Sequence, residues 1–228
     1  MTKIPGLKIN LEDEESADFY LNWKGIDLYM HVITVFQNKY QNEKEFNYQE
    51  ISSFIRYDKS LRNRLFSYLT LLEEFLRAKL LFHKDILVVF KIKAKEIDNF
   101  KLISRQNLNS RSKLYFSLAK SQVSFGDLVK LCKNNYVLND IESKDWNKFV
   151  KLRNQIMHHK FLLLKNYEKW TDIEKNITEI RKILKILVQY LPEAYQKGFI
   201  KSIDSLLINN KENIIFTRIN LGELNYEK

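Results

Sequence analysis

One short stretch contains residue types that can carry out acid–base chemistry on a phosphate. It reads Lys151-Leu152-Arg153-Asn154-Gln155-Ile156-Met157-His158-His159. A histidine ordinarily titrates near neutral pH, so its imidazole can accept or donate a proton. An arginine guanidinium can bind phosphoryl oxygens and neutralise charge that develops on them. Arg153 and His158 therefore predict a site that acts on a phosphodiester, and this chemistry needs no metal or other cofactor.

The stretch is expected to lie in a helix that begins near Asn139 and Asp140, either of which can cap its N-terminus. Apolar residues then recur at intervals of three and four, as Trp146, Phe149, Val150, Ile156 and Met157. At about 100° per residue, Arg153 falls within this apolar stripe. A guanidinium in that position implies a carboxylate partner, a subunit interface or an anionic ligand such as phosphate.

His158 is expected about 140° around the helix from Arg153 but only about 40° from Asn154. Asn154 could thus orient His158, whereas Arg153 would have to curl round to share a site with it. Two copies of the helix facing each other would bring these groups together and would supply two imidazoles. The sequence therefore predicts a homodimer with a composite site, in which His159 packs or helps to shape the cleft.

A second informative stretch runs from Tyr57 to His83 and is expected to be a packing helix. Its apolar stripe consists of Leu61, Leu65, Leu69, Leu72, Leu76 and Leu80. Along one edge lie Arg62, Glu73 and Arg77, with Asp58 expected near the helix N-terminus. These charges form a ladder within the helix, or Glu73 or Asp58 reaches across to hold Arg153, and the two arrangements are compatible.

Both stretches resemble a known family. The pattern Arg-x4-His, given by Arg153 and His158, resembles the motif of HEPN-domain ribonucleases, and Arg-Asn-x-x-x-His-His is similar to its form in Abi-like (abortive infection) phage-defence proteins. That family also carries an aspartate followed by Leu-Arg, then a glutamate and Leu-Arg-Ala. The corresponding residues are Asp58, Leu61-Arg62, Glu73 and Leu76-Arg77-Ala78. Arg77 and His83 give a further pairing at a neighbouring spacing.

The resemblance implies an all-α, HEPN-like helical bundle with additional helices, and a dimeric site that cleaves RNA. An imidazole would remove the proton from the ribose 2′-OH, which attacks the adjacent phosphorus and leaves a 2′,3′-cyclic phosphate and a 5′-OH. The expected catalytic residues are Arg153, His158 and Asn154, supported by Asp58, Arg62, Glu73, Arg77 and His159. Abi-like proteins restrict phage growth by damaging RNA, so a restraining protein or non-coding RNA antitoxin is expected.

Two other function classes fit the same residues. The chain could be a non-catalytic RNA-binding module, in which Arg153 and His158 bind phosphate without cutting. It could instead be a helical interaction protein, in which Arg153 belongs to a buried ion pair.

Composition supports a helical protein with a polyanionic partner. The 228 residues include only five glycines and two prolines, which favours long helices over many short strands. A net charge of +10 suits nucleic acid or an acidic membrane surface. No signal peptide or membrane-spanning run is evident, so a cytoplasmic protein is expected. The single cysteine, Cys132, is expected in the core.

The chain is expected to comprise an N-terminal helical segment (1–45), the HEPN-like bundle (46–200) and a C-terminal tail (201–228). Gly25 should end one helix and begin another, and Pro192 should end an amphipathic helix that starts near Tyr167. Basic and aromatic residues alternate from 86 to 121 and offer phosphate contacts. The tail contains an apolar run that fits either a short strand or a docking arm.

Overall fold

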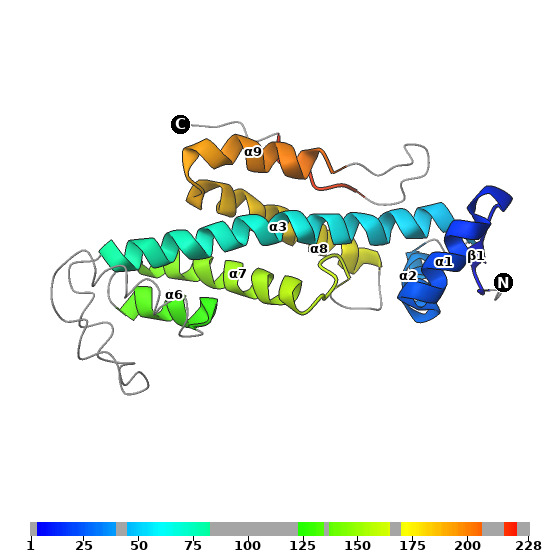
Figure 1. Ribbon diagram of the computed structural model, residues 1–228, viewed down its shortest axis with the longest axis horizontal. Coiled ribbons are helices and arrows are strands. Elements are labelled where there is room, and N and C mark those ends of the chain that lie inside the picture. Colours follow the sequence, from blue (N-terminus) through cyan, green and yellow to red (C-terminus); the bar gives the residue numbers. More distant parts are fainter. Residues whose placement is uncertain are drawn as a thin grey trace. The chain divides into compact units, whose positions relative to one another are not determined.

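The computed structural model describes residues 4–39, 45–82, 123–134, 137–164, 170–206 and 217–222. Most of these residues are α-helical (Figure 1). Within them, strand structure is limited to β1 (Leu7–Lys8) and β2 (Phe46–Asn47), which pair in parallel. The expected all-α fold class is therefore confirmed, while the relation to HEPN bundles stays a prediction. In the same residues, no helix is both long enough and apolar enough to cross a bilayer.

The chain divides into two compact units. The first comprises Met1–Leu65 and Gln155–Lys228, and the second comprises Phe66–Asn154. Each is described by itself below. The sequence-based segments 1–45, 46–200 and 201–228 stay a prediction.

The first unit begins with two short helices that follow β1. A 3-10 turn (Leu11–Asp13) leads into α1 (Glu14–Lys24), and α2 spans Ile26–Lys39. Gly25 separates them with a φ of 87°, a left-handed conformation that glycine adopts without strain. The predicted break at Gly25 is confirmed. Phe36 of α2 packs against Phe46 of β2 and against Phe54, with ring centroids 5.8 and 5.3 Å away.

The long helix α3 spans Tyr48–Phe82, so it begins well before the expected start at Tyr57. Its N-terminus is capped by Glu50, whose carboxylate accepts the N–H of Asn47 at 2.8 Å. The predicted leucine stripe is confirmed, because all six leucines are fully buried. The expected placement of Asp58 near a helix N-terminus is wrong, since ten residues of α3 precede it.

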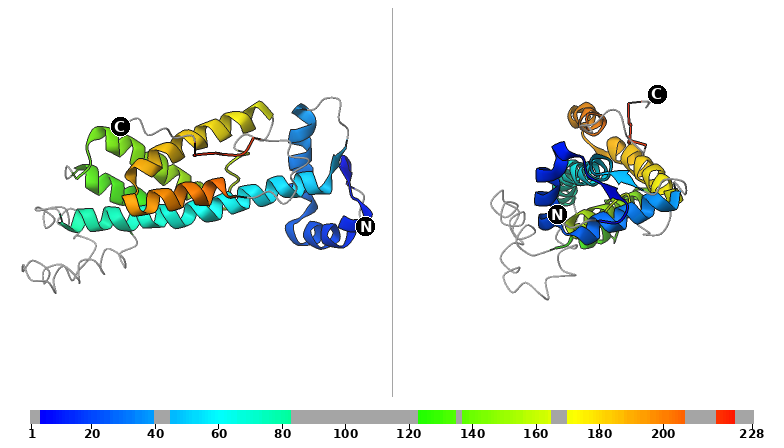
Figure 2. Two further views of the ribbon diagram at one scale, coloured as in Figure 1. Left: turned by 90° about the horizontal axis from the view of Figure 1, so that it is seen from above. Right: turned by 90° about the vertical axis from the view of Figure 1, so that its right-hand side faces the viewer.

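The rest of the first unit consists of α8 (Trp170–Tyr190), α9 (Glu193–Asp204) and a docked segment, 217–222. As predicted, α8 is amphipathic, and Pro192 separates it from α9. The buried face of α8 consists of Ile173, Ile177, Ile180, Leu184, Leu187 and Val188. Figure 2 shows the 217–222 segment in red beside these helices. The N–H of Ile219 donates to the Tyr57 hydroxyl at 2.9 Å, and that of Leu221 donates to Asp204 Oδ1 at 2.7 Å. This part of the tail is thus a docking arm.

In the second unit, the later part of α3 is accompanied by α6 (Phe125–Asn134) and most of α7 (Asp140–Met157). Phe125 of α6 meets Trp146 of α7 edge to face at 6.0 Å. Cys132 is fully buried, and burial raises the pKa of its thiol to about 12. Its predicted core role is confirmed. His83 and the stretch 86–121 lie outside the described residues.

Candidate functional site

The helix that carries Arg153 starts with a reciprocal cap. The N–H of Glu142 donates to Asn139 Oδ1 at 2.9 Å, and the N–H of Asn139 donates to Glu142 Oε2 at 2.8 Å. The predicted capping role of Asn139 is confirmed. This cap fixes where α7 begins and hence which of its side chains face inward.

The buried face of α7 differs in part from the predicted apolar stripe. Trp146, Phe149 and Ile156 are buried as expected, and Val150 is partly buried. Met157 is 44% exposed, so its assignment to the buried stripe was wrong, whereas Leu152 is buried and was missed. Periodicity predicts the centre of a buried helix face better than its edges. Whether a residue at an edge is buried depends on which neighbouring elements pack there.

Arg153 shares one carboxylate with Arg77 in the second unit. Glu73 Oε1 accepts a hydrogen bond from Arg77 Nη2 at 2.5 Å, and Glu73 Oε2 lies 3.7 Å from Arg153 Nη2. The ladder within α3 and the predicted reach of Glu73 to Arg153 are therefore both confirmed. At 3.7 Å the second contact is an ion pair without a hydrogen bond.

The charges of this cluster do not balance, because two guanidinium groups face one carboxylate. The Arg153 side chain keeps 29% of its surface exposed, and within the described residues it makes no hydrogen bond. The Arg77 Nε is buried and has no hydrogen-bond partner among those residues. The cluster of Glu73, Arg77 and Arg153 thus retains positive charge and N–H donors that an anion could use.

Asp58 forms a separate anchor in the first unit. Its fully buried carboxylate accepts the backbone N–H groups of Leu162 and Leu163 through Oδ1, at 2.9 and 3.1 Å. Its Oδ2 accepts Arg62 Nε at 2.8 Å, and the Arg62 guanidinium lies 5.6 Å from the ring centroid of Phe161. Asp58 therefore holds the segment that follows the two histidines.

Burial raises the pKa of the Asp58 carboxyl above its usual range, against the opposing effects of Arg62 and the two backbone N–H groups. The other side of the same segment is held by Asn176, whose Nδ2 donates to the Leu163 carbonyl at 3.0 Å. Residues 162 and 163 are thus fixed through their backbone from two helices, α3 and α8.

The C-terminus of α7 forms a Schellman motif. The helix ends at Met157, and the N–H of His159 then donates to the Ile156 carbonyl while that of Lys160 donates to the Gln155 carbonyl, each at 3.0 Å. His159 has a φ of 53°, in the left-handed position that glycine usually occupies. The main role of His159 in this turn is to end the helix.

The expectation that both histidines lie inside a helix is therefore wrong. His158 and His159 belong to the turn after α7, and both side chains are exposed. The helical angles expected for His158 do not apply, because the residue lies beyond the last helical position. Asn154 is also exposed, and its predicted role of orienting His158 stays a prediction.

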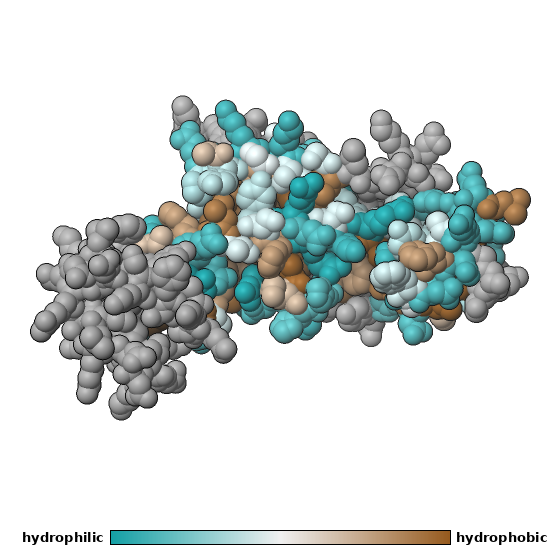
Figure 3. Space-filling view, in the orientation of Figure 1, coloured by the Kyte–Doolittle hydropathy of each residue, from teal (hydrophilic) through white to brown (hydrophobic). Residues whose placement is uncertain are grey.

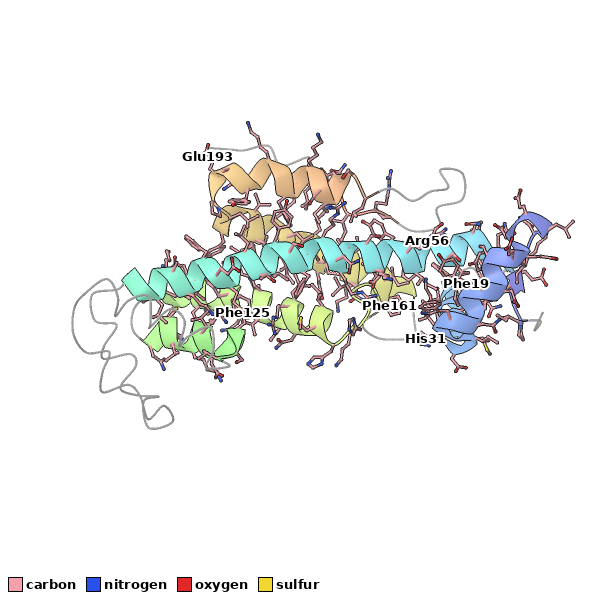
Figure 4. The ribbon with its side chains drawn as sticks, in the orientation of Figure 1. Phe19, His31, Arg56, Phe125, Phe161 and Glu193 are labelled. Carbon is pink, nitrogen blue, oxygen red and sulfur yellow. The ribbon has the colours of Figure 1, made fainter. Side chains whose placement is uncertain are left out.

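The structure groups the predicted site residues into two clusters. Glu73, Arg77 and Arg153 come together in the second unit, and Asp58 and Arg62 hold the segment near Phe161 in the first (Figure 4 labels Phe161). The histidines lie in the turn that precedes this segment. Convergence of Arg153 and His158 on one substrate stays a prediction.

The backbone role of residues 162 and 163 could not have been found from the sequence, because a main-chain donor leaves no side-chain signal.

In the described ranges, no cluster of three or more His, Cys, Asp or Glu side chains could hold a metal ion. No protein-family model, curated protein or solved structure matches the chain.

Proposed function

We propose that the chain is a metal-independent endoribonuclease of the HEPN type that acts in abortive infection, in the cytoplasm. The observation that carries the proposal is the end of α7. There an exposed histidine, His158, follows closely in the chain after Arg153, whose charge is only partly neutralised by Glu73. An accessible imidazole and a guanidinium with unused donors are the groups that transesterification of RNA requires.

In the proposed reaction, His158 removes the proton from a ribose 2′-OH, and the resulting alkoxide attacks the adjacent phosphorus. Arg153 stabilises the negative charge on the phosphoryl oxygens. The bond to the 5′-oxygen breaks, and that oxygen takes a proton from an acid. His158 of a second copy of the chain is the proposed acid, so the active enzyme is a homodimer with a composite site. The products are a 2′,3′-cyclic phosphate and a 5′-OH.

A second candidate function is favoured by the contact between Arg153 and Glu73. An arginine that pairs with a buried carboxylate can be a structural element of a helical interaction protein, or part of a module that binds RNA without cutting it. If Arg153 is structural, Arg153→Ala and Glu73→Gln would each lower the free energy of unfolding, because each removes the same ion pair. Neither would alter any RNA activity.

The experiment that tests the proposal is cleavage of labelled single-stranded RNA by the purified chain in EDTA. Wild type, Arg153→Ala and His158→Ala are compared after thermal unfolding has shown that all three are folded. The control is Asn147→Ala, at an exposed position of α7. We expect both site variants to lose at least about a hundredfold in rate and the control to cut normally. Wild type should leave cyclic-phosphate ends.

Cleavage that persists in His158→Ala would overturn the assignment of the imidazole. If folded, dimeric wild type cuts no RNA in the test tube, the chain is next expressed in cells. There we expect expression of the wild-type chain alone to arrest growth and His158→Ala to be harmless. A harmless wild type that also cuts no RNA would overturn the proposed activity, whereas an antitoxin, either a protein or a non-coding RNA, would be sought where growth arrest is observed.

A further inference from the structure

Helix α1 exposes three aromatic side chains that contact one another. Phe19, Tyr20 and Trp23 are 53%, 39% and 76% exposed. The Phe19 ring lies 5.2 Å from that of Tyr20 and 5.4 Å from that of Trp23, measured between centroids. Figure 3 shows a hydrophobic patch over α1 with hydrophilic surface around it. Large aromatic groups that stay exposed in contact with each other commonly mark a binding surface.

Positive charge continues this strip on one side. The Lys24 ammonium lies over the Tyr20 ring, 4.8 Å from its centroid. Burial lowers the pKa of Lys24, and the nearby positive charges of Lys59 and Arg56 lower it further. Arg56 is labelled in Figure 4. Its Nη2 donates to Gln49 Oε1 at 3.0 Å and to Ser53 Oγ at 3.3 Å, both within α3.

These cations have no carboxylate of their own. Within the described part of the chain, Lys24, Arg56 and Lys59 form no ion pair. Like charges near one another without a counter-ion repel one another. An anion bound here would remove that repulsion.

Two acidic residues of α1, Glu15 and Asp18, lie on the other side of the aromatic strip. On an ideal helix, Glu15 and Asp18 are about 80° and 140° from Trp23 in one direction, whereas Lys24 is about 100° away in the other. A polyanion laid along α1 would thus be repelled from one edge and attracted to the opposite edge. The surface therefore fixes which side of the aromatic groups a phosphate backbone can follow.

We propose that this surface, which we call the α1 strip (Phe19, Tyr20, Trp23, Lys24, Arg56 and Lys59), binds single-stranded RNA. Bases stack on Trp23 and Phe19, and the phosphates that join them contact Lys24, Arg56 and Lys59. This combination of aromatic stacking and adjacent cations is the general mode by which proteins hold single strands. The inference deepens the proposed ribonuclease function by assigning how its substrate is held, although RNA binding here can be tested without cleavage.

A second copy of the chain fits the α1 strip less well. Even wholly exposed, three aromatic side chains present at most about 750 Å², which is less than the ~800 Å² per partner of a standard interface. An anionic membrane would also meet Glu15 and Asp18, whose charge it would repel. A single strand of RNA is narrow enough to follow the strip and avoid that edge.

The test measures binding of a fluorescent oligouridine by the full chain with His158→Ala present, so that the probe stays intact. We expect Trp23→Ala to weaken binding about tenfold and Trp23→Phe to retain most of the affinity, because any aromatic face can stack. Tyr195→Ala, at a 48% exposed aromatic residue of α9, is the matched control and should bind normally. Lys59→Gln should reduce the slope of log affinity against log salt by about 0.7.

Unchanged oligouridine binding by folded Trp23→Ala would overturn the inference, and so would equal losses in Trp23→Ala and Tyr195→Ala. If Trp23→Ala changes only the self-association seen in sedimentation, the strip binds a second copy of the chain. If it changes only binding to phosphatidylserine vesicles, the strip binds membranes. Either result also overturns the inference. If Trp23 controls binding while wild type never cuts RNA, the α1 strip stands and the proposed ribonuclease fails. If wild type cuts RNA and Trp23→Ala binds and cuts equally well, the strip fails alone.

Discussion

At the scale of single residues, Asp58 shows how one carboxylate can organise a segment far away in the chain. It accepts the N–H groups of Leu162 and Leu163, which lie 104 and 105 positions later in the chain and follow the candidate histidines after Lys160 and Phe161. The sequence suggested that Asp58 belongs to the charge ladder that includes Arg62, or that it reaches Arg153. The pair with Arg62 is observed, and the other two partners are backbone amides, which a pattern of side chains cannot reveal.

The buried Asp58 carboxyl should make stability depend on pH. Because its pKa is raised above the ordinary value of 3.8, the stability that this group contributes is complete below that value and is lost as pH rises through the folded-state pKa. Asp58→Asn cannot ionise but keeps an oxygen that can accept both N–H groups. We therefore expect the free energy of unfolding of wild type, relative to Asp58→Asn, to fall as pH rises above about 4.

Urea unfolding of both proteins across this range measures the difference, and Glu74→Gln, at an exposed position of α3, is the control. A wild type that gains stability over Asp58→Asn as pH rises would show that the contacts with Arg62 and the backbone outweigh burial.

At the scale of elements, the sequence predicted helices well where a local signal marks them. Gly25, Pro192 and the cap at Asn139 are such signals, and the leucine stripe of α3 required only a regular period. The earlier start of α3 also had a local signal, since Asn47 and Glu50 have the spacing of a capping box. The end of α7 had none, because neither glycine nor asparagine follows Met157.

The left-handed residue that ends α7 gives a prediction about stability. At a φ of 53°, a residue with a Cβ costs roughly 1 kcal/mol relative to glycine. Glycine also loses more entropy on folding, which offsets part of this gain. We therefore expect His159→Gly to raise the free energy of unfolding by about 0.5 kcal/mol. His159→Val should lower it, because a β-branched residue fits this conformation poorly.

Chemical denaturation of the three proteins measures this effect. The same His159→Gly variant should cleave RNA normally if His158 alone supplies the imidazole. Loss of cleavage in a variant that is more stable than wild type would assign a chemical role to His159 as well.

At the scale of the whole molecule, scarce glycine and proline predicted the all-α class, which the structure confirms. The polyanionic partner that a charge of +10 suggests stays a prediction. The sequence did not predict the division into two units, because α3 and α7 each contribute residues to both. A helix is continuous in sequence, and no composition change marks Leu65 or Asn154 as a boundary.

The proposed composite site predicts that one defective subunit inactivates a whole dimer. A mixed dimer of wild type and His158→Ala retains only one of the two imidazoles that supply the base and the acid. We expect an excess of His158→Ala, after subunit exchange, to suppress the RNA cleavage of wild type. Sedimentation of each protein checks that dimers are present, and cleavage that persists undiminished after subunit exchange would argue against a shared site.

The docked segment 217–222 has a practical consequence for shortened versions of this protein. The backbone N–H of Ile219 donates to Tyr57, and that of Leu221 donates to Asp204. The side chains of Ile219 and Leu221 are both buried. A chain cut before Thr217 would expose the apolar surface that they cover and would deprive Asp204 of a donor. Fragments prepared for crystallisation should therefore extend at least to Gly222. That position should also stay glycine, because an added Cβ would lie 3.0 Å from Asp204 Oδ2.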